Sequence, residues 1–263
     1  MYRGFNLKKI NFEDAIILHQ IGLSLHEGHK QEVMKVLKNF ALNEGVLNGS
    51  KMQSDWFPQI NSHIFISHSH DDRDTVITLA GWLYKYLGVT AFIDSCVWGN
   101  ANDLLKLLDD KFCLNDGGKT YNYTKRNYST SHVHMMLSTA LSKMIDKTEC
   151  LFFYNTPQSI SSSSIISKTE SPWIYSEITM TQLLRHNMPE RIKRKIADAD
   201  TKTFSKGGVT ERLKIEYEVD LTHLVDIDAD TLNSWRECGA KGEKALDKLY
   251  ELMPIKKPEI IQE

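Results

Sequence analysis

The spacing of hydrophobic residues along the chain changes near residue 60. Before that point, apolar residues recur at helical spacing around residues 15–21 and 33–40, which predicts two helices. Beyond it, short apolar runs alternate with longer helical patterns. The runs that predict buried strands are residues 63–66, 89–93 and 150–154. Alternating strands and helices favour a mostly parallel sheet with helices on both faces.

Two of the predicted helices have well-defined ends. One follows the first apolar run, and Gly88 stands where a glycine commonly ends a helix. Another begins with Ser171 as N-cap and Pro172 at its first helical position, and it runs to about residue 186. Strand ends and helix starts of this kind are typical of an α/β domain.

The remaining segments have weaker patterns. Residues 115–131 are polar and contain two adjacent glycines, so they predict a long loop. Residues 213–225 predict one or two strands, and residues 232–252 predict a closing helix. We therefore expect three parts: a helical extension over residues 1–60, an α/β domain over 61–252 with a long insertion at about 100–131, and a tail over 253–263.

Composition narrows the classes of partner. The formal net charge is -2 and the pI about 6.6, so bulk charge gives no reason to expect binding to nucleic acid or to an anionic membrane. The four cysteines are scattered without a CxxC pair, and the start of the chain has no signal-peptide pattern. No apolar run is long enough to span a bilayer. These features predict a cytoplasmic protein that binds neither nucleic acid nor membrane.

Polar residues follow each of the three predicted strands. They are residues 67–72, residues 94–99 and the segment from Asn155 onward. Ligands of open parallel sheets bind beyond the carboxyl ends of the strands, so we expect the functional groups there.

Glu177 occupies an unusual position in the helix that begins at Pro172. A helical wheel places it in the middle of the apolar arc formed by Trp173, Ile174, Ile178, Met180 and Leu184. A carboxylate in a core-facing arc is costly without a partner or a function. One interpretation is structural, with Glu177 paired to a neighbouring Lys or Arg, or favoured by the helix N-terminus. The other is functional, because Trp173 lies one turn away and an indole beside a desolvated acid suits a flat, cationic heterocycle.

Three stretches together resemble Toll/interleukin-1 receptor (TIR) domains. Phe65-Ile66-Ser67 is similar to the first strand of that family, and Phe92-Ile93-Asp94 to its second. The third stretch, from Ser171 to Glu177, resembles the S-x-W-x-x-x-E pattern of TIR enzymes that cleave NAD+. The resemblance covers residues 61–186, and the segment to about 252 fits the last strand and helix.

The resemblance implies a flavodoxin-like fold and a set of site residues. Glu177 would be the catalytic acid, and Trp173 would lie beside the nicotinamide or adenine ring. Ser67, His68 and Ser69 would line the dinucleotide, and Asp94 would begin the loop over the site. The chain departs from the family after Asp94, where Trp98-Gly99 and the insertion replace a short loop and helix.

The resemblance also implies an activity. NAD+ would be the substrate, with no further cofactor, and the bond between nicotinamide and ribose would break through an oxocarbenium-like state. The product would be ADP-ribose or a cyclic ADP-ribose isomer, as in TIR proteins of Thoeris-type antiphage systems. Self-association through TIR contacts and a downstream effector that senses a cyclic product are the partners expected.

Two other hypotheses remain open from the sequence. His68, His70 and Asp72 resemble the H-x-H-x-D-H metal motif of metallo-β-lactamase-type hydrolases, although Arg73 replaces the last histidine. Alternatively, the chain is a non-catalytic TIR module that assembles with other TIR domains through the loop after Asp94.

Overall fold

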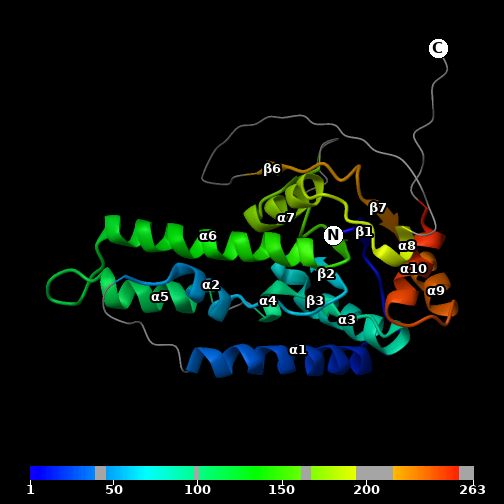
Figure 1. Ribbon diagram of the computed structural model, residues 1–263, viewed down its shortest axis with the longest axis horizontal. Helices are drawn as coiled ribbons and strands as arrows, with labels where there is room; N and C mark the ends of the chain where they lie inside the picture. Colours follow the sequence, from blue (N-terminus) through cyan, green and yellow to red (C-terminus); the bar gives the residue numbers. More distant parts are fainter. Residues whose placement is uncertain (39–45, 98–100, 161–166, 194–215, 255–263) are drawn as a thin grey trace, which may run out of the picture.

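A computed structural model of the chain describes residues 1–38, 46–97, 101–160, 167–193 and 216–254. Its centre is a sheet of five parallel strands in the order β3-β2-β4-β1-β7 (Figure 1). The strands are β1 (Arg3–Lys8), β2 (Ile64–Ser67), β3 (Ala91–Phe92), β4 (Cys150–Asn155) and β7 (Val225–Ile227). The α/β fold with a parallel central sheet, expected from the sequence, is confirmed.

Helices cover both faces of the sheet. The face that we call the α3 face carries α1 (Ala15–Lys38), α3 (Arg73–Leu87), α9 (Ala229–Glu237) and α10 (Glu243–Leu252). The opposite α6 face carries α2 (Gly49–Trp56), α5 (Ala101–Phe112), α6 (Tyr123–Lys147) and α7 (Pro172–Leu183). The short elements are η1 (His70–Asp72), α4 (Asp94–Val97), α8 (Glu190–Lys193) and an antiparallel pair, β5 (Lys168–Thr169) with β6 (Tyr217–Glu218).

Alternation of side chains along the strands builds a separate core on each face. In β4, Phe152 and Tyr154 join the core under α3, whereas Leu151 and Phe153 join the core under α6 and α7. All four side chains are essentially buried. Because successive residues of a strand point to opposite faces, one continuous apolar run supplies both cores.

Two glycines let α1 lie directly against α3. A Cβ atom at Gly81 would lie 1.9 Å from the carbonyl oxygen of Leu18, and a Cβ at Gly22 would lie 2.0 Å from the carbonyl oxygen of Ile77. No real Cβ atom tolerates such distances. The absence of side chains at both positions therefore allows the two helix backbones to touch.

The structure corrects the expected helical extension over residues 1–60. Helices are present there, but Arg3–Lys8 forms β1, which lies inside the sheet between β4 and β7. With β2 counted as the first strand, the spatial order matches the 2-1-3-4-5 order of flavodoxin-like sheets. The fourth position, however, is filled by the first residues of the chain. The two apolar side chains of this short strand, Phe5 and Leu7, were too few to reveal it.

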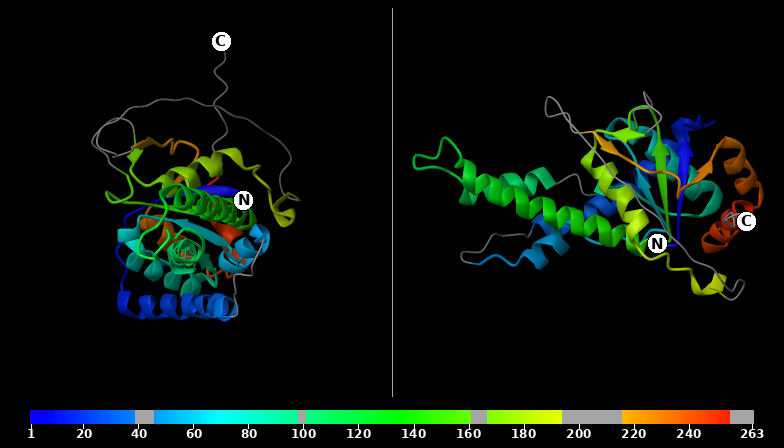
Figure 2. Two further views of the ribbon diagram at one scale, coloured as in Figure 1. Left: turned by 90° about the vertical axis from the view of Figure 1, so that its left-hand side faces the viewer. Right: turned by 90° about the horizontal axis from the view of Figure 1, so that it is seen from above.

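The predicted loop over residues 115–131 is also corrected. Helix α6 begins at Tyr123, where the side chain of Asn122 accepts a hydrogen bond from the backbone N–H of Lys125. Buried Asp109 of α5 binds Arg126 and Ser129 of α6, which holds the first turns of this polar helix in place. Together α5 and α6 form an arm that projects beyond the sheet (Figure 2).

Smaller differences concern the end of the chain. The predicted closing helix is divided into α9 and α10 by Gly239 and Gly242, both of which have positive φ. Of the predicted strand region 213–225, residues 213–215 lie outside the described residues, and the rest contains β6 and the start of β7. The expected tail lies outside the described residues beyond residue 254.

A search for membrane-spanning helices among the described residues found none that combines sufficient length with sufficient apolar character.

Candidate functional site

The carboxyl ends of β2 and β3 bring together the residues that the sequence singled out. Ser67 is the last residue of β2, and Asp94 follows β3 at the start of α4. Helix α7 delivers Glu177 to the same place from the α6 face. Its N-cap is Ser171, whose hydroxyl accepts a hydrogen bond from the N–H of Ile174, and Pro172 is its first residue. The start predicted for this helix is confirmed.

Glu177 is buried, with 3% of its surface exposed. The hydroxyl of Ser67 donates a hydrogen bond to its Oε2 atom over 2.6 Å. Within the described residues, no Lys or Arg forms an ion pair with this carboxyl group. The alternative that Glu177 pairs with a neighbouring Lys or Arg is therefore not supported within the described residues. Its hydrogen-bond partner is the neutral hydroxyl of Ser67.

The surroundings of Glu177 disfavour its charged form. Burial is the largest cause and the nearby charge of Asp94 the second, and together they hold the pKa of Glu177 well above its ordinary value. The hydrogen bond from Ser67 acts in the opposite direction. The site holds two carboxyl groups, and no Lys or Arg of the described residues forms an ion pair with Glu177. It therefore favours a positively charged ligand, which would supply the opposite charge.

His68 is a second neighbour of Asp94. Its ring is buried, with Nδ1 3.3 Å from the carbonyl oxygen of Ile66 and 3.9 Å from Oδ1 of Asp94. Because a carbonyl oxygen only accepts, Nδ1 carries a proton toward Ile66, and Nε2 lies 3.0 Å from the hydroxyl of Ser95. Asp94 is thus near both His68 and Glu177, at the ends of β2 and β3. The sequence analysis did not identify Ser95, since a serine in a polar loop carries no distinguishing pattern.

Trp173 and Ser69 lie at the margin of this cluster. Trp173 is one turn before Glu177 on α7, half-buried, and its ring meets His134 of α6 edge-on at 5.8 Å between centroids. Ser69 precedes η1, where its carbonyl accepts from the N–H of Asp72. The loop residues Trp98 and Gly99 lie outside the described residues.

The residues of the proposed metal motif are engaged elsewhere. Asp72 is buried and accepts a hydrogen bond from the hydroxyl of Thr156, which follows β4. His68 is held by Ile66 and Ser95, as described above. Among the residues that the structure describes, no group of three His, Cys, Asp or Glu side chains is placed to hold a metal ion. The described geometry therefore gives the metal-hydrolase hypothesis no support.

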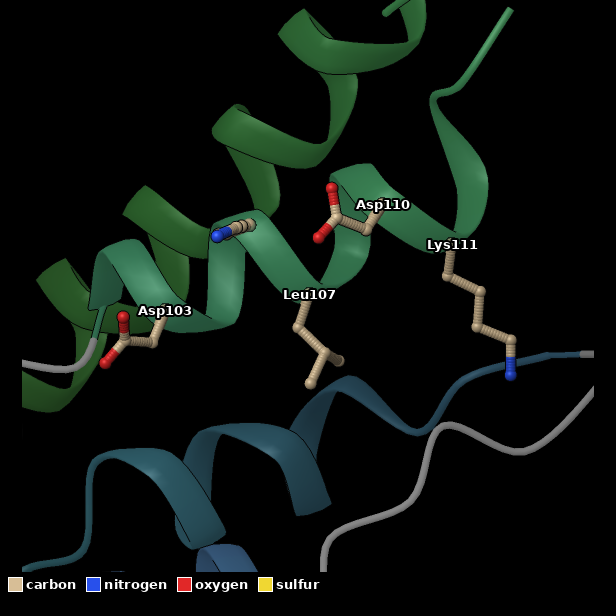
Figure 3. A pocket seen from close by; sticks show the side chains of 5 residues that line it. Asp103, Leu107, Asp110 and Lys111 are labelled. Carbon is tan, nitrogen blue, oxygen red and sulfur yellow. The ribbon is translucent and has the colours of Figure 1, made fainter. Parts of the chain in front are cut away.

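Two surface cavities lie apart from these residues. One, of about 620 Å³, is lined by α5 of the arm (Figure 3). Its lining combines Asp103 and Asp110 with Lys106 and Lys111 around Leu107, so it has no excess of either charge. The second, of about 180 Å³, lies between α3, α9 and the segment after β1. Neither contains a group of the Glu177 cluster.

Comparison of the chain with protein-family models, with curated proteins and with solved structures found no match. Functional inference therefore depends on the site itself.

Proposed function

We propose that the chain is a TIR-type enzyme that cleaves the bond between nicotinamide and ribose in NAD+, with Glu177 as its catalytic carboxylate. The observation that carries this proposal is the position of Glu177: buried, bonded to Ser67 and close to Asp94, at the carboxyl ends of two parallel strands. Parallel α/β sheets bind their ligands at this edge.

The chemistry requires few groups. Cleavage breaks the C1′–N bond, the electron pair leaves with neutral nicotinamide, and positive charge develops on the ribose. A carboxylate held beside that carbon stabilises the cation, and burial strengthens the interaction because water does not screen it. Water as nucleophile gives ADP-ribose, whereas an atom of the adenine gives a cyclic isomer.

The raised pKa of Glu177 fits this task. In the free protein, burial and Asp94 favour the neutral acid. The nicotinamide ring of NAD+ is a cation, so its binding favours the carboxylate form and lowers the pKa of Glu177. Substrate binding thus generates the negative charge that the reaction uses.

The direct test is incubation of purified protein with NAD+ and detection of released nicotinamide, comparing the wild type with Glu177→Gln. We expect the glutamine variant to lose at least about 10³-fold in turnover, because it cannot supply the negative charge. Glu170→Gln, an exposed glutamate just before α7, is the matched control and should keep full activity.

Stability measurements separate catalysis from folding. An acid whose folded pKa is raised adds stability at low pH, and this stability is lost as pH rises through the folded pKa. Glu177→Gln should therefore unfold at the same temperature as the wild type or above it at neutral and alkaline pH. A folded Glu177→Gln variant with unchanged turnover contradicts the proposal; no nicotinamide release by the wild type, with self-association retained, favours the non-catalytic TIR module.

The wider setting belongs to the same proposal. We place the enzyme in the cytoplasm, in antiphage defence, active when it self-associates, and producing a nucleotide signal for a downstream effector. Mass spectrometry of the products tests the last point: a cyclic ADP-ribose isomer supports a signal, whereas ADP-ribose alone supports simple depletion of NAD+.

A further inference from the structure

Strand β1 has two different faces although it lies in the interior of the sheet. Phe5 and Leu7 point to the α3 face and are completely buried. The intervening Asn6 and the following Lys8 point to the α6 face. Interior strands of a parallel sheet that is covered on both sides are normally apolar on both faces. The polar face of β1 therefore needs an explanation other than packing.

The polar residues of this face are aligned with the Glu177 site. Strand register pairs Ser67 with Phe153, Phe153 with Asn6, and Asn6 with Asp226. Paired residues of parallel strands point to the same face, so these four side chains form one row across β2, β4, β1 and β7. One end of the row is the hydroxyl that binds Glu177. The other end is the carboxylate of Asp226.

Hydrogen bonds connect the part of the row beyond β4. The side-chain amide of Asn155 donates to Oδ1 of Asn6 over 3.0 Å, and the amide of Asn6 donates to Oδ1 of Asp226 over 2.7 Å. Nζ of Lys8 lies 3.3 Å from the other oxygen of Asp226. Asn6 is buried, whereas the side chains of Lys8 and Asp226 are 61% and 62% exposed. The row is thus fixed at its centre and open at its far end.

The connections that follow the strands also distinguish β4 from its two neighbours, β2 and β1. Strands β2, β1 and β7 each continue into helices on the α3 face, whereas β4, which lies between β2 and β1, continues into α7 on the opposite face. Ligands of open α/β sheets bind beyond the carboxyl ends of neighbouring strands whose connections leave to opposite faces. Strand β4 differs in this way from both of its neighbours. Glu177 lies at the end of the β2–β4 pair, and Asn6 belongs to the β4–β1 pair.

Resting on the proposed function, we propose that Lys8 and Asp226, held by Asn6 and Asn155, form a second subsite that binds the adenosine diphosphate half of the dinucleotide. The spacing is suitable: three strand spacings of ~4.8 Å separate β2 from β7, roughly 14 Å, which is of the order of a ribose–diphosphate–ribose unit.

Each exposed group has a defined role in this subsite. Asp226 accepts hydrogen bonds from the hydroxyls of the adenosine ribose, as acidic residues at strand ends do in other dinucleotide sites. Lys8 binds the diphosphate. Its present ion pair with Asp226 is exposed to solvent and therefore weak, so it exchanges readily for a phosphate. An acid at this position also excludes a ribose 2′-phosphate, which predicts a preference for NAD+ over NADP+.

The experiment compares a whole substrate with a truncated one. Nicotinamide riboside keeps the scissile bond and lacks the diphosphate and the second nucleoside. For NAD+, Lys8→Ala should raise KM about tenfold with kcat unchanged, because one charge-assisted contact is lost. For nicotinamide riboside, neither constant should change. Lys9→Ala, its exposed neighbour, is the matched control and should leave both substrates unaffected.

The second variant tests specificity. Asp226→Asn keeps an oxygen for Asn6 and removes the charge, so the discrimination between NAD+ and NADP+ should fall about tenfold. An equal loss toward NAD+ and nicotinamide riboside, or unchanged constants for both, overturns the subsite.

Binding of ADP separates this proposal from the activity. By calorimetry, ADP should bind the wild type and the Glu177→Gln variant equally, and Lys8→Ala about tenfold more weakly. If the wild type cleaves NAD+ but Lys8→Ala has an unchanged KM, the subsite is wrong and the proposed function stands. If no NAD+ is cleaved, ADP binding that weakens in Lys8→Ala still supports the subsite. Undetectable binding, or equal binding by wild type and Lys8→Ala, overturns it.

Discussion

The same strands present different kinds of side chain to the two faces of the sheet. On the α3 face, buried Arg3 lies at the start of β1, but toward their carboxyl ends β2, β4 and β1 carry the core residues Ile66, Tyr154 and Leu7. On the same face α1 lies directly against α3 at Gly22 and Gly81. On the α6 face, the same strands are apolar only at first. Toward their carboxyl ends they present Ser67, Asn6 and Asn155, and α7 adds the buried Glu177.

This difference shows where the molecule departs from a simple packed fold. Buried polar groups cost free energy, and at the carboxyl ends of β2 and β1 two of them, Ser67 and Asn6, lie on the α6 face, where α7 adds Glu177. Under the proposed function, the α3 face is the half of the sheet that stabilises the fold, and the carboxyl edge of the α6 face is the half that binds the substrate. Predictions that act on one face should leave the property of the other unchanged.

The largest expected effect is a loss of stability when α1 is forced away from α3. Gly81→Ala places a Cβ atom against the carbonyl oxygen of Leu18, so α1 must move away from α3. We expect a loss of about 3 kcal/mol or more in the free energy of unfolding, measured by urea denaturation. Gly28→Ala is the same substitution in α1 at a position with no atom within 4 Å, and it should stabilise by ~0.5–1 kcal/mol. Equal behaviour of the two variants would show that the helices are not in contact.

A smaller effect, visible in pH profiles, is expected on the α6 face. If the chain has the proposed activity, catalysis requires ionised Glu177, so kcat/KM should rise with pH through a pKa well above that of an ordinary glutamate. Ser67→Ala removes the hydrogen bond that lowers this pKa, so the rise should move to higher pH, with about tenfold less activity at neutral pH. Asp94→Asn removes a neighbouring charge, so the rise should move to lower pH.

The prediction is tested most directly by the opposite directions in which Ser67→Ala and Asp94→Asn should shift the pH profile. Shifts in the same direction, or an ordinary glutamate profile in the wild type, would mean that Glu177 does not control the rate. Thermal unfolding of both variants provides the control, because neither substitution touches the α3 face.

The smallest effect concerns the helix that carries Glu177. Ser171→Ala removes the N-cap of α7 and should cost about 1 kcal/mol, measured by chemical denaturation. Ser171→Asp keeps an oxygen acceptor for the N–H of Ile174 and should restore the stability. A cost in Ser171→Asp as large as in Ser171→Ala would assign the effect to packing instead of capping.

The main elements of the fold and the principal acid were predictable because their signals are local. Gly88 ends α3 with a positive φ, and Ser171 with Pro172 begins α7, as expected. The apolar runs gave β2, β3 and β4. The burial of Glu177 followed from its place in the helical arc, and its environment agrees with that prediction. These features depend on residues within one or two turns of each other.

The rest depends on contacts between distant residues. Strand β1 has only two inward apolar side chains and is stabilised by β4 and β7, which follow much later in the chain. The start of α6 is held by Asp109 of another helix. His68 follows β2 and Ser95 follows β3, so the contact between them cannot be predicted from either segment alone.

The place of β1 has a consequence for biosynthesis. This strand is translated before both of its neighbours in the sheet, which end at Asn155 and Ile227. At ~5–20 residues per second, about 7–30 s pass before β4 has been translated and about 11–44 s before β7, so one edge of β1 lacks its final partner until the later time. The sheet is therefore completed only after β7 has emerged, and a nascent polypeptide of this sequence should depend on chaperone protection until then.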